Sequence, residues 1–372
     1  MDLAFLTPLT DRSGPWASVY IDTSRHSAST AQERSVEAAG VQRSLAAVGA
    51  DEPTCRAVRA AVDDLQHTSE PMGRALFAAQ GEVALDLPLS TAPVPSAGWG
   101  ALPRTTPLLD LVGEDPLCLV AHVDRKGADL ELHSARGDMT VGTVSGRQWP
   151  VHRTATADWS ERHFQLRVEN TWEHNAGEIA EAVADRQAET QAELVVLVGD
   201  DRECASVKDK LPGPLRDRTM RARHGAGSRL LGVELEQARA QHVARRVSHE
   251  MERYAEAFGR QEGAVAGVPG LVDAAREHRV EELLVRPEGP DPHREVWVGQ
   301  SPDQVAVRRT DAIALGAKDP VSARADDALM RCAAASGAAA LSVSAATPDS
   351  GPAGGLGALL RWTEPATDVA GS

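Results

Sequence analysis

The pattern of apolar and polar positions divides the first ninety residues into strands and helices. The stretch PWASVYID (15–22) is rich in β-branched and aromatic residues, which favours a strand. Two helical patterns follow, one from about Ala31 to Val48 and one after Pro53. The runs RALFAAQ and EVALDLPL (74–89) then predict a pair of strands, so this part of the chain is expected to be an α/β domain.

The middle of the chain has the pattern of a hairpin, a strand, a long helix and a buried strand. The segment LCLVAHVDRKGADLELHSA (117–135) predicts a β-hairpin that turns at Asp-Arg-Lys-Gly, and MTVGTVSG adds a strand. After the polar loop WPVHRTATADWSERHF (149–164), a helical pattern runs from about Ser160 to Ala192. The fully apolar run ELVVLVGD (193–200) then predicts a central strand of an α/β sheet.

Two stretches rich in Gly, Pro or Ser mark boundaries between domains. The first, TAPVPSAGWGALPRTTP (91–107), predicts a linker or a long connection, and the second, GRQEGAVAGVPG (259–270), follows a long amphipathic helix at 230–258. Beyond it, helix and strand patterns alternate as far as GLGALLRW, which is typical of a compact three-layer α/β/α domain. We therefore predict an α/β protein of three domains, at residues 1–112, 113–260 and 261–372, with a disordered tail.

Composition changes this picture mainly by what it excludes. The 372 residues carry a net charge of −15, so any contact with a polyanion must use a local basic patch. The four cysteines, Cys55, Cys118, Cys204 and Cys332, lie too far apart for a zinc motif or a disulfide scaffold and are interpreted as reduced, buried thiols. Neither a signal peptide nor a run of about 18 apolar residues is present, which predicts a soluble cytoplasmic protein.

The common catalytic motifs are absent, and the remaining candidates are weak. There is no phosphate-binding GxxxxGK[ST] and no GxSxG; the cluster GGLGALL (354–360) precedes a strand and is interpreted as a close-packed turn. The pairs His163 with His174 and His242 with His249 are too widely spaced along a helix to share a metal ion, so no metal or cofactor is predicted. Asp200-Asp201 follows the apolar strand, where it could serve an active site but is more typical of a helix cap.

One basic run stands out against the acidic background. The stretch RDRTMRARHGAGSR (216–229) holds five arginines and one acid, together with Gly and Ser. A solvated loop and a site for phosphate-backbone contacts both remain open as interpretations of this run.

Several motifs resemble a known superfamily. From hairpin to buried strand, the order of elements is similar to the central domain of archaeal and eukaryotic class-I release factors and of Pelota, which has an RNase-H-like fold. The helix FQLRVENTWEHNAGEIAEAVA (164–184) carries the Glu-x-x-x-x-His-Asn pattern of that domain. Residues 14–363 resemble the actinobacterial branch of bacterial release-factor homologues, which includes the Balon-like ribosome hibernation factors. The motifs that carry this resemblance are PWASVYID, GRALFA, VDRKGADLE, WPVHR and GLGALLRW.

The resemblance implies a three-domain protein that binds the ribosomal A site. The N-terminal domain would face the decoding centre, with the loop TSRHSAST (23–30) as its candidate contact. The C-terminal Pelota-like domain would contact a translational GTPase, which is EF-Tu for Balon-like proteins. The ribosome and EF-Tu are therefore the expected partners, with tRNA as a further contact and no membrane partner.

The chain departs from the family at the residues that release peptide. Counting back without gaps from His174-Asn175, the family's GGQ tripeptide falls on Asp158, Trp159 and Ser160. A tryptophan cannot freely adopt the backbone conformations open to glycine, and neither neighbour supplies the glutamine that positions a water at the ester. Ser160 is interpreted instead as the cap of the long helix. No catalytic residue is therefore predicted.

Two functions follow from the resemblance. The first is a ribosome-binding hibernation factor without release activity, in which His152, Arg153, Trp159, Arg216, Arg218, Arg221 and Arg223 contact RNA. The alternative is a peptidyl-tRNA hydrolase that acts in ribosome rescue, with Gln165 as the nearest candidate for a water-positioning side chain; we expect this residue on the helix and not at the loop tip. A metal-dependent nuclease would require a carboxylate cluster for which the sequence offers no candidate.

Overall fold

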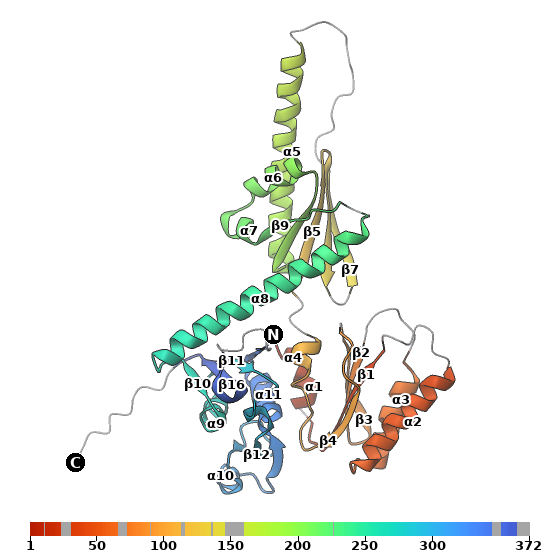
Figure 1. Cartoon of the computed structure of the whole chain (residues 1–372), viewed down its shortest axis with the longest axis vertical. Helices are drawn as coiled ribbons and strands as arrows, with labels where there is room; N and C mark the ends of the chain where they lie inside the picture. The colour runs from red at the N-terminus through yellow and green to blue at the C-terminus, as the bar shows by residue number, and fades with distance from the viewer. Residues whose placement is uncertain are drawn as a thin grey trace, which may run out of the picture. The chain divides into compact units, whose positions relative to one another are not determined.

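The computed structural model describes residues 1–10, 12–23, 31–65, 73–89, 91–112, 116–134, 137–145, 160–225, 227–343 and 351–362. The chain forms two compact units (Figure 1). One unit combines Met1–Glu114 with Val247–Ser372, and the other is Asp115–Arg246. Both contain helices and sheets, so the predicted α/β class is confirmed. The division into three domains at residues 112 and 260 stays a prediction.

A four-stranded antiparallel sheet forms the N-terminal part of the first unit. Its strands lie in the order β3-β2-β1-β4, with bounds β1 (Trp16–Asp22), β2 (Gly73–Ala79), β3 (Glu82–Leu89) and β4 (Ser96–Gly100). Helices α2 (Ala31–Ala47) and α3 (Glu52–Asp63) pack on one face of the sheet. The short helices η1 (Ala4–Leu6), α1 (Thr7–Thr10) and α4 (Leu108–Leu111) contribute leucines to the core on the other face.

Cover on both faces explains why β1 is mostly apolar on both of its faces. Val19 and Ile21 point into the core under α2 and α3, whereas Trp16 and Tyr20 point into the opposite core. Successive side chains of a strand alternate between the two faces, so both sets must be apolar when both faces are buried. The ring of Tyr20 meets Phe77 of β2 edge to face, with centroids 6.0 Å apart.

The predicted linker at 91–107 is wrong in part. It contains strand β4, which pairs with β1 so that Trp99 lies opposite Ala17. The Gly- and Ser-rich composition of Ser96–Gly100 hides this edge strand, because its place in the sheet depends on backbone pairing with β1 and not on an apolar pattern. The segment therefore belongs to the N-terminal sheet.

Two further sheets form the C-terminal part of the same unit. The larger has the order β10-β16-β11-β15 and the smaller the order β13-β12-β14. Their strands are β10 (Ala264–Ala266), β11 (Val280–Val285), β12 (Glu295–Val298), β13 (Val305–Ala306), β14 (Val321–Arg324), β15 (Ala339–Ser342) and β16 (Leu356–Leu360). The helical elements are α9 (Val268–Arg276), η3 (Asp291–His293), α10 (Arg309–Ala314), α11 (Ala325–Ser336) and η4 (Ala353–Gly355).

Helices cover both faces of the larger C-terminal sheet, so the predicted α/β/α layering is confirmed. Helices α9 and α11 pack against one face, in the core that contains Leu283 and Val285. Met251 and Tyr254, near the end of helix α8 (Arg229–Gly259), pack against the other face beside Leu284 and Leu341. One outer layer is thus supplied by a helix that precedes the Gly-rich break.

The glycine cluster before the last strand is a turn, as predicted. Gly354 and Gly355 have φ angles of 80° and 94°, in the left-handed region that favours glycine. A Cβ atom on Gly354 would meet the carboxylate of Asp291. The cluster therefore serves close packing between η3 and the start of β16.

The second unit is a five-stranded sheet with helices on both faces. Its order is β7-β6-β5-β8-β9, with bounds β5 (Cys118–Asp124), β6 (Gly127–Ser134), β7 (Gly137–Ser145), β8 (Leu194–Gly199) and β9 (Thr219–Arg221). The first three strands form an antiparallel meander, and β8 and β9 run parallel to β5. This arrangement agrees with the predicted RNase-H-like fold.

Three helices and the first part of α8 cover this sheet. Helices α5 (Ser160–Thr190), α6 (Asp201–Lys210) and α7 (Gly213–Arg218) contribute to the core that includes Leu119 and Leu197. Leu231 and Leu235 of α8 pack on the opposite face against Val120 and Val196. The ribbon of α5 extends beyond the end of the sheet (Figure 1).

Two smaller observations bear on the sequence-based expectations. All four cysteines are buried free thiols, as predicted. Within the described ranges, no helix combines the length and the apolar character that a bilayer span requires.

Candidate nucleic-acid interface

The polar loop at 149–164, predicted to take the place of the family's catalytic loop, lies mostly outside the described residues. This applies to His152, Arg153, Asp158 and Trp159. The RNA contacts predicted for His152, Arg153 and Trp159 therefore stay predictions. Ser160 is the first residue of α5, at the predicted start of the long helix. Gln165 lies within α5, as expected.

The asparagine of the His-Asn pair fixes the position of α5 against the β5–β6 hairpin. Asn175 is 1% exposed, and its side-chain amide donates a hydrogen bond to the carbonyl oxygen of Arg125 in the hairpin turn, at 3.2 Å. His174 is half exposed and lies 3.2 Å from Glu178, one turn further along the helix. The asparagine is therefore a structural residue that holds α5 against the sheet.

Two of the four predicted RNA-binding arginines in the basic run are used for local structure. The guanidinium of Arg216 donates hydrogen bonds to the carbonyl oxygens of Asp209 (2.7 Å) and Leu211 (3.0 Å), at the end of α6. Arg218 donates to the carbonyl oxygen of Pro214 at 3.3 Å, within its own helix. The two bonds from Arg216 satisfy carbonyl groups that the end of α6 leaves without partners.

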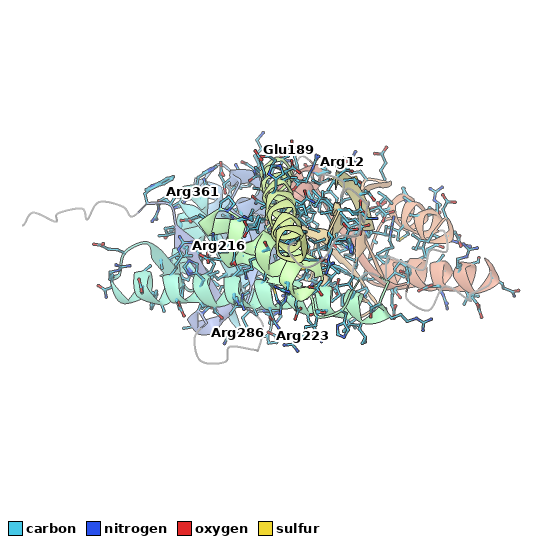
Figure 2. The ribbon with its side chains drawn as sticks, turned by 90° about the horizontal axis from the view of Figure 1, so that it is seen from above. Arg12, Glu189, Arg216, Arg223, Arg286 and Arg361 are labelled. Carbon is cyan, nitrogen blue, oxygen red and sulfur yellow. The ribbon has the colours of Figure 1, made fainter. Side chains whose placement is uncertain are left out.

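The other two arginines lie on β9 and in the loop that follows it. Arg221 is paired with Asp201 at the start of α6, with Nε 3.5 Å from the carboxylate, and it also donates to the Asp201 carbonyl oxygen at 3.3 Å. Arg223 is exposed, and among the described residues no group accepts a hydrogen bond from its guanidinium. Arg216 and Arg223 lie apart on the surface (Figure 2).

A carboxylate of α8 holds the backbone on which Arg223 lies. Glu234 accepts hydrogen bonds from the backbone N–H groups of Arg223 (2.7 Å) and His224 (3.2 Å), and from His224 Nδ1 at 2.9 Å. Burial acts to raise the pKa of Glu234, but these donors outweigh it and the pKa is lowered. The carboxylate therefore stays ionised and keeps the loop in place at neutral pH.

Lys208, Arg221 and Arg223 line one cleft. Its volume is about 490 Å³, and its other lining residues are Asp201, Cys204, Ala205 and Asp209. We name this surface the β9 cleft. The sequence did not identify Lys208, because a lysine in the last turn of a helix is ordinary and only the fold brings it beside β9.

Side chains in and near the β9 cleft offer no nucleophile or metal centre. Burial raises the pKa of the Cys204 thiol to about 11, although Arg221 opposes the shift, so the thiol stays protonated at neutral pH. Asp200 caps α6 by accepting a hydrogen bond from the backbone N–H of Arg202 at 3.0 Å, which confirms the cap interpretation. Across the described side chains, no group of three or more His, Cys, Asp and Glu residues is arranged to hold a metal ion.

Comparison with known families gives a match that covers most of the second unit. Residues 117–263 match the family described as bacterial archaeo-eukaryotic release factor family 2. This range contains the whole five-stranded sheet, the motif helix α5 and the β9 cleft. The predicted resemblance to release factors is therefore confirmed for this part of the chain.

Relatives extend the likeness to nearly the whole chain. The chain is 28% identical over 370 residues to the protein named uncharacterized protein Rv2629 of Mycobacterium tuberculosis (strain ATCC 25618 / H37Rv), and the match covers 96% of each sequence. Among solved structures, it is similar to the archaeal translation termination factor aRF1, with 18% identity, 97% of each chain covered and a TM-score of 0.25. It is also similar to archaeal Pelota in a model of ribosome-bound Pelota and ABCE1, with 14% identity, 97% and 94% coverage and a TM-score of 0.40.

Proposed function

We propose that this protein is a ribosome-binding translation factor of the release-factor superfamily that occupies the A site of idle ribosomes. In this proposal it belongs to the actinobacterial, Balon-like branch, acts in dormancy or stress together with EF-Tu, and does not release peptide. The observation that carries the proposal is the family match over residues 117–263, which spans the release-factor-like unit. The C-terminal segment 261–372 would contact EF-Tu, by analogy with Pelota-like domains.

The sequence at the GGQ position supports a function without hydrolysis. By the ungapped count from His174-Asn175, Asp158, Trp159 and Ser160 take the place of the family's Gly-Gly-Gln. Ester hydrolysis by the family depends on a glutamine side chain that positions a water, and on glycines that permit its approach. Gln165, the nearest alternative, lies inside α5.

Sedimentation with ribosomes tests the proposed binding. The purified full-length protein is mixed with vacant 70S ribosomes, with or without EF-Tu, and the mixture is centrifuged through sucrose. We expect the protein in the ribosomal fraction, displaced by an A-site ligand such as aminoacyl-tRNA. A protein that stays at the top of the gradient at low salt, with and without EF-Tu, would show that the proposal is wrong.

A peptide-release assay separates the proposal from the peptidyl-tRNA hydrolase alternative. Ribosomes that carry labelled peptidyl-tRNA are incubated with the protein, and a GGQ-containing release factor serves as the positive control. We expect no release above the rate without protein. Release that is lost in Gln165→Ala or Ser160→Ala would instead identify a hydrolase.

A further inference from the structure

We infer that the β9 cleft binds a single backbone phosphate of RNA, through Lys208, Arg221 and Arg223. This inference rests on the proposed ribosome binding and assigns one specific contact to it. The three cationic side chains come from α6, from β9 and from the loop after β9, and they line one cleft of about 490 Å³. Ammonium and guanidinium groups that face one cavity are suited to the oxygens of a phosphodiester.

The ammonium of Lys208 and the backbone that carries Arg223 are held in place before any ligand binds. Lys208 donates a hydrogen bond from Nζ to the carbonyl oxygen of Thr219 at 2.7 Å, which fixes the ammonium beside β9. Glu234 fixes the backbone at Arg223 through the two N–H groups that it accepts. A site that is ordered in advance loses less conformational entropy when it binds.

The charge of the lining limits the ligand to one phosphate. Three cations face two carboxylates, Asp201 and Asp209, and Asp201 is already paired with Arg221. The lining therefore has an excess of one positive charge, which one phosphodiester neutralises. A run of phosphates would bring further negative charge towards Asp209.

The other lining residues indicate a contact that does not depend on base sequence. Cys204 and Ala205 complete the lining, which contains no aromatic ring for stacking and no Asn or Gln for base edges. Contacts of this kind fix the position of a protein on RNA without specifying the sequence.

Fluorescence anisotropy with a labelled single-stranded RNA of mixed sequence tests the inference in the full-length protein. The variants are Arg223→Ala and Lys208→Gln, and the matched control is Arg202→Ala, which removes the same charge from an exposed position on α6 outside the lining. We expect Arg223→Ala and Lys208→Gln each to weaken binding by about tenfold, as for loss of a charge-assisted hydrogen bond. The plot of log affinity against log salt should become less steep by roughly 0.7 for each variant.

A positioning variant extends the test. Glu234→Gln removes the ionised acceptor that holds the loop but leaves all three cations of the lining in place. We expect weaker RNA binding with an unchanged salt dependence, because the number of phosphate contacts stays the same while their alignment is lost. A variant with unchanged affinity would show that the loop needs no such support and would contradict preorganisation of the site.

The outcomes separate this inference from the proposed function. Equal losses in Arg202→Ala and the two cleft variants would overturn it in favour of general electrostatic attraction. Wild-type protein that sediments with ribosomes but binds no RNA at low salt would overturn it and leave the proposed function standing. Displacement of RNA by micromolar guanosine monophosphate would overturn RNA as the source of the phosphate and assign the cleft to a mononucleotide.

Discussion

At the residue scale, two neighbouring aspartates in the first turn of α11 differ in how well their carboxylates are paired. Asp326 receives two hydrogen bonds from the Arg324 guanidinium, at 3.0 and 2.6 Å. Asp327 is 5% exposed, and among the described residues its carboxylate has a long hydrogen bond from Thr106 (3.4 Å) and the more distant Arg324 Nε at 3.7 Å. Burial and the charge of Asp326 raise the pKa of Asp327 to about 8, although nearby arginines oppose the shift.

The raised pKa of Asp327 predicts how the free energy of unfolding depends on pH. The Asp327 carboxyl keeps its proton up to about pH 8 when folded, but it ionises near 3.8 when unfolded. Between these values the folded state binds more protons, so rising pH favours unfolding. We expect Asp327→Asn to raise stability by roughly 1–2 kcal/mol at pH 7, with a gain that grows from pH 4 to pH 8 and then levels off.

Thermal unfolding at a series of pH values measures this effect. Asp326→Asn is the matched control, because it breaks the hydrogen-bonded pair with Arg324 and should lower the unfolding temperature at pH 7. A lower unfolding temperature for Asp327→Asn at pH 8 would contradict a protonated carboxyl at this position.

At the element scale, the attachment of α5 to the hairpin gives a prediction with a built-in control. Asn175→Ala removes the buried amide that donates to the Arg125 carbonyl oxygen, and we expect a loss of about 1–3 kcal/mol in the free energy of unfolding. His174→Ala removes only an exposed pair with Glu178 and should cost less than about 1 kcal/mol. Denaturant unfolding, followed by circular dichroism, compares the two; equal losses would show that Asn175 has no anchoring role.

The same scale shows what the sequence could predict and what it could not. Strands β1 and β8 and helix α5 were predictable, because long apolar or periodic runs are needed wherever both faces of a sheet are covered. Strand β4 was not, since Gly98 and Ser96 give no apolar pattern and its place depends on pairing with a strand about eighty residues earlier.

The candidate interface shows a similar limit. The arginine run was visible as a concentration of charge, but charge alone does not show that Arg216 is used to cap α6 whereas Arg223 faces an open cleft. Lys208 becomes a candidate only when β9 lies beside the last turn of α6. Sequence therefore indicates where phosphate contacts could occur, and the fold selects the side chains that can make them.

At the scale of the whole molecule, a strongly acidic chain is proposed to bind a particle made largely of RNA. A net charge of −15 repels phosphate over distances set by the Debye length, about 10 Å at 0.1 M salt. The β9 cleft presents a small excess of positive charge against this background. Such a distribution permits a few placed contacts and disfavours indiscriminate binding to RNA.

The two electrostatic contributions respond to salt in opposite directions. Added salt weakens each phosphate contact by reducing the gain from counterion release, but it also screens the repulsion between the acidic chain and the ribosome. Between about 50 and 300 mM potassium chloride, we expect a shallow plot of log affinity for 70S ribosomes against log salt concentration. The magnitude of its slope should stay below about 3, because each phosphate contact contributes at most about 0.9. Equilibrium binding of fluorescently labelled protein to ribosomes provides the measurement, and Arg223→Ala should flatten the slope further. A slope as steep as about −6 would require several more phosphate contacts than the β9 cleft can supply, and would direct attention to other basic surfaces of the chain.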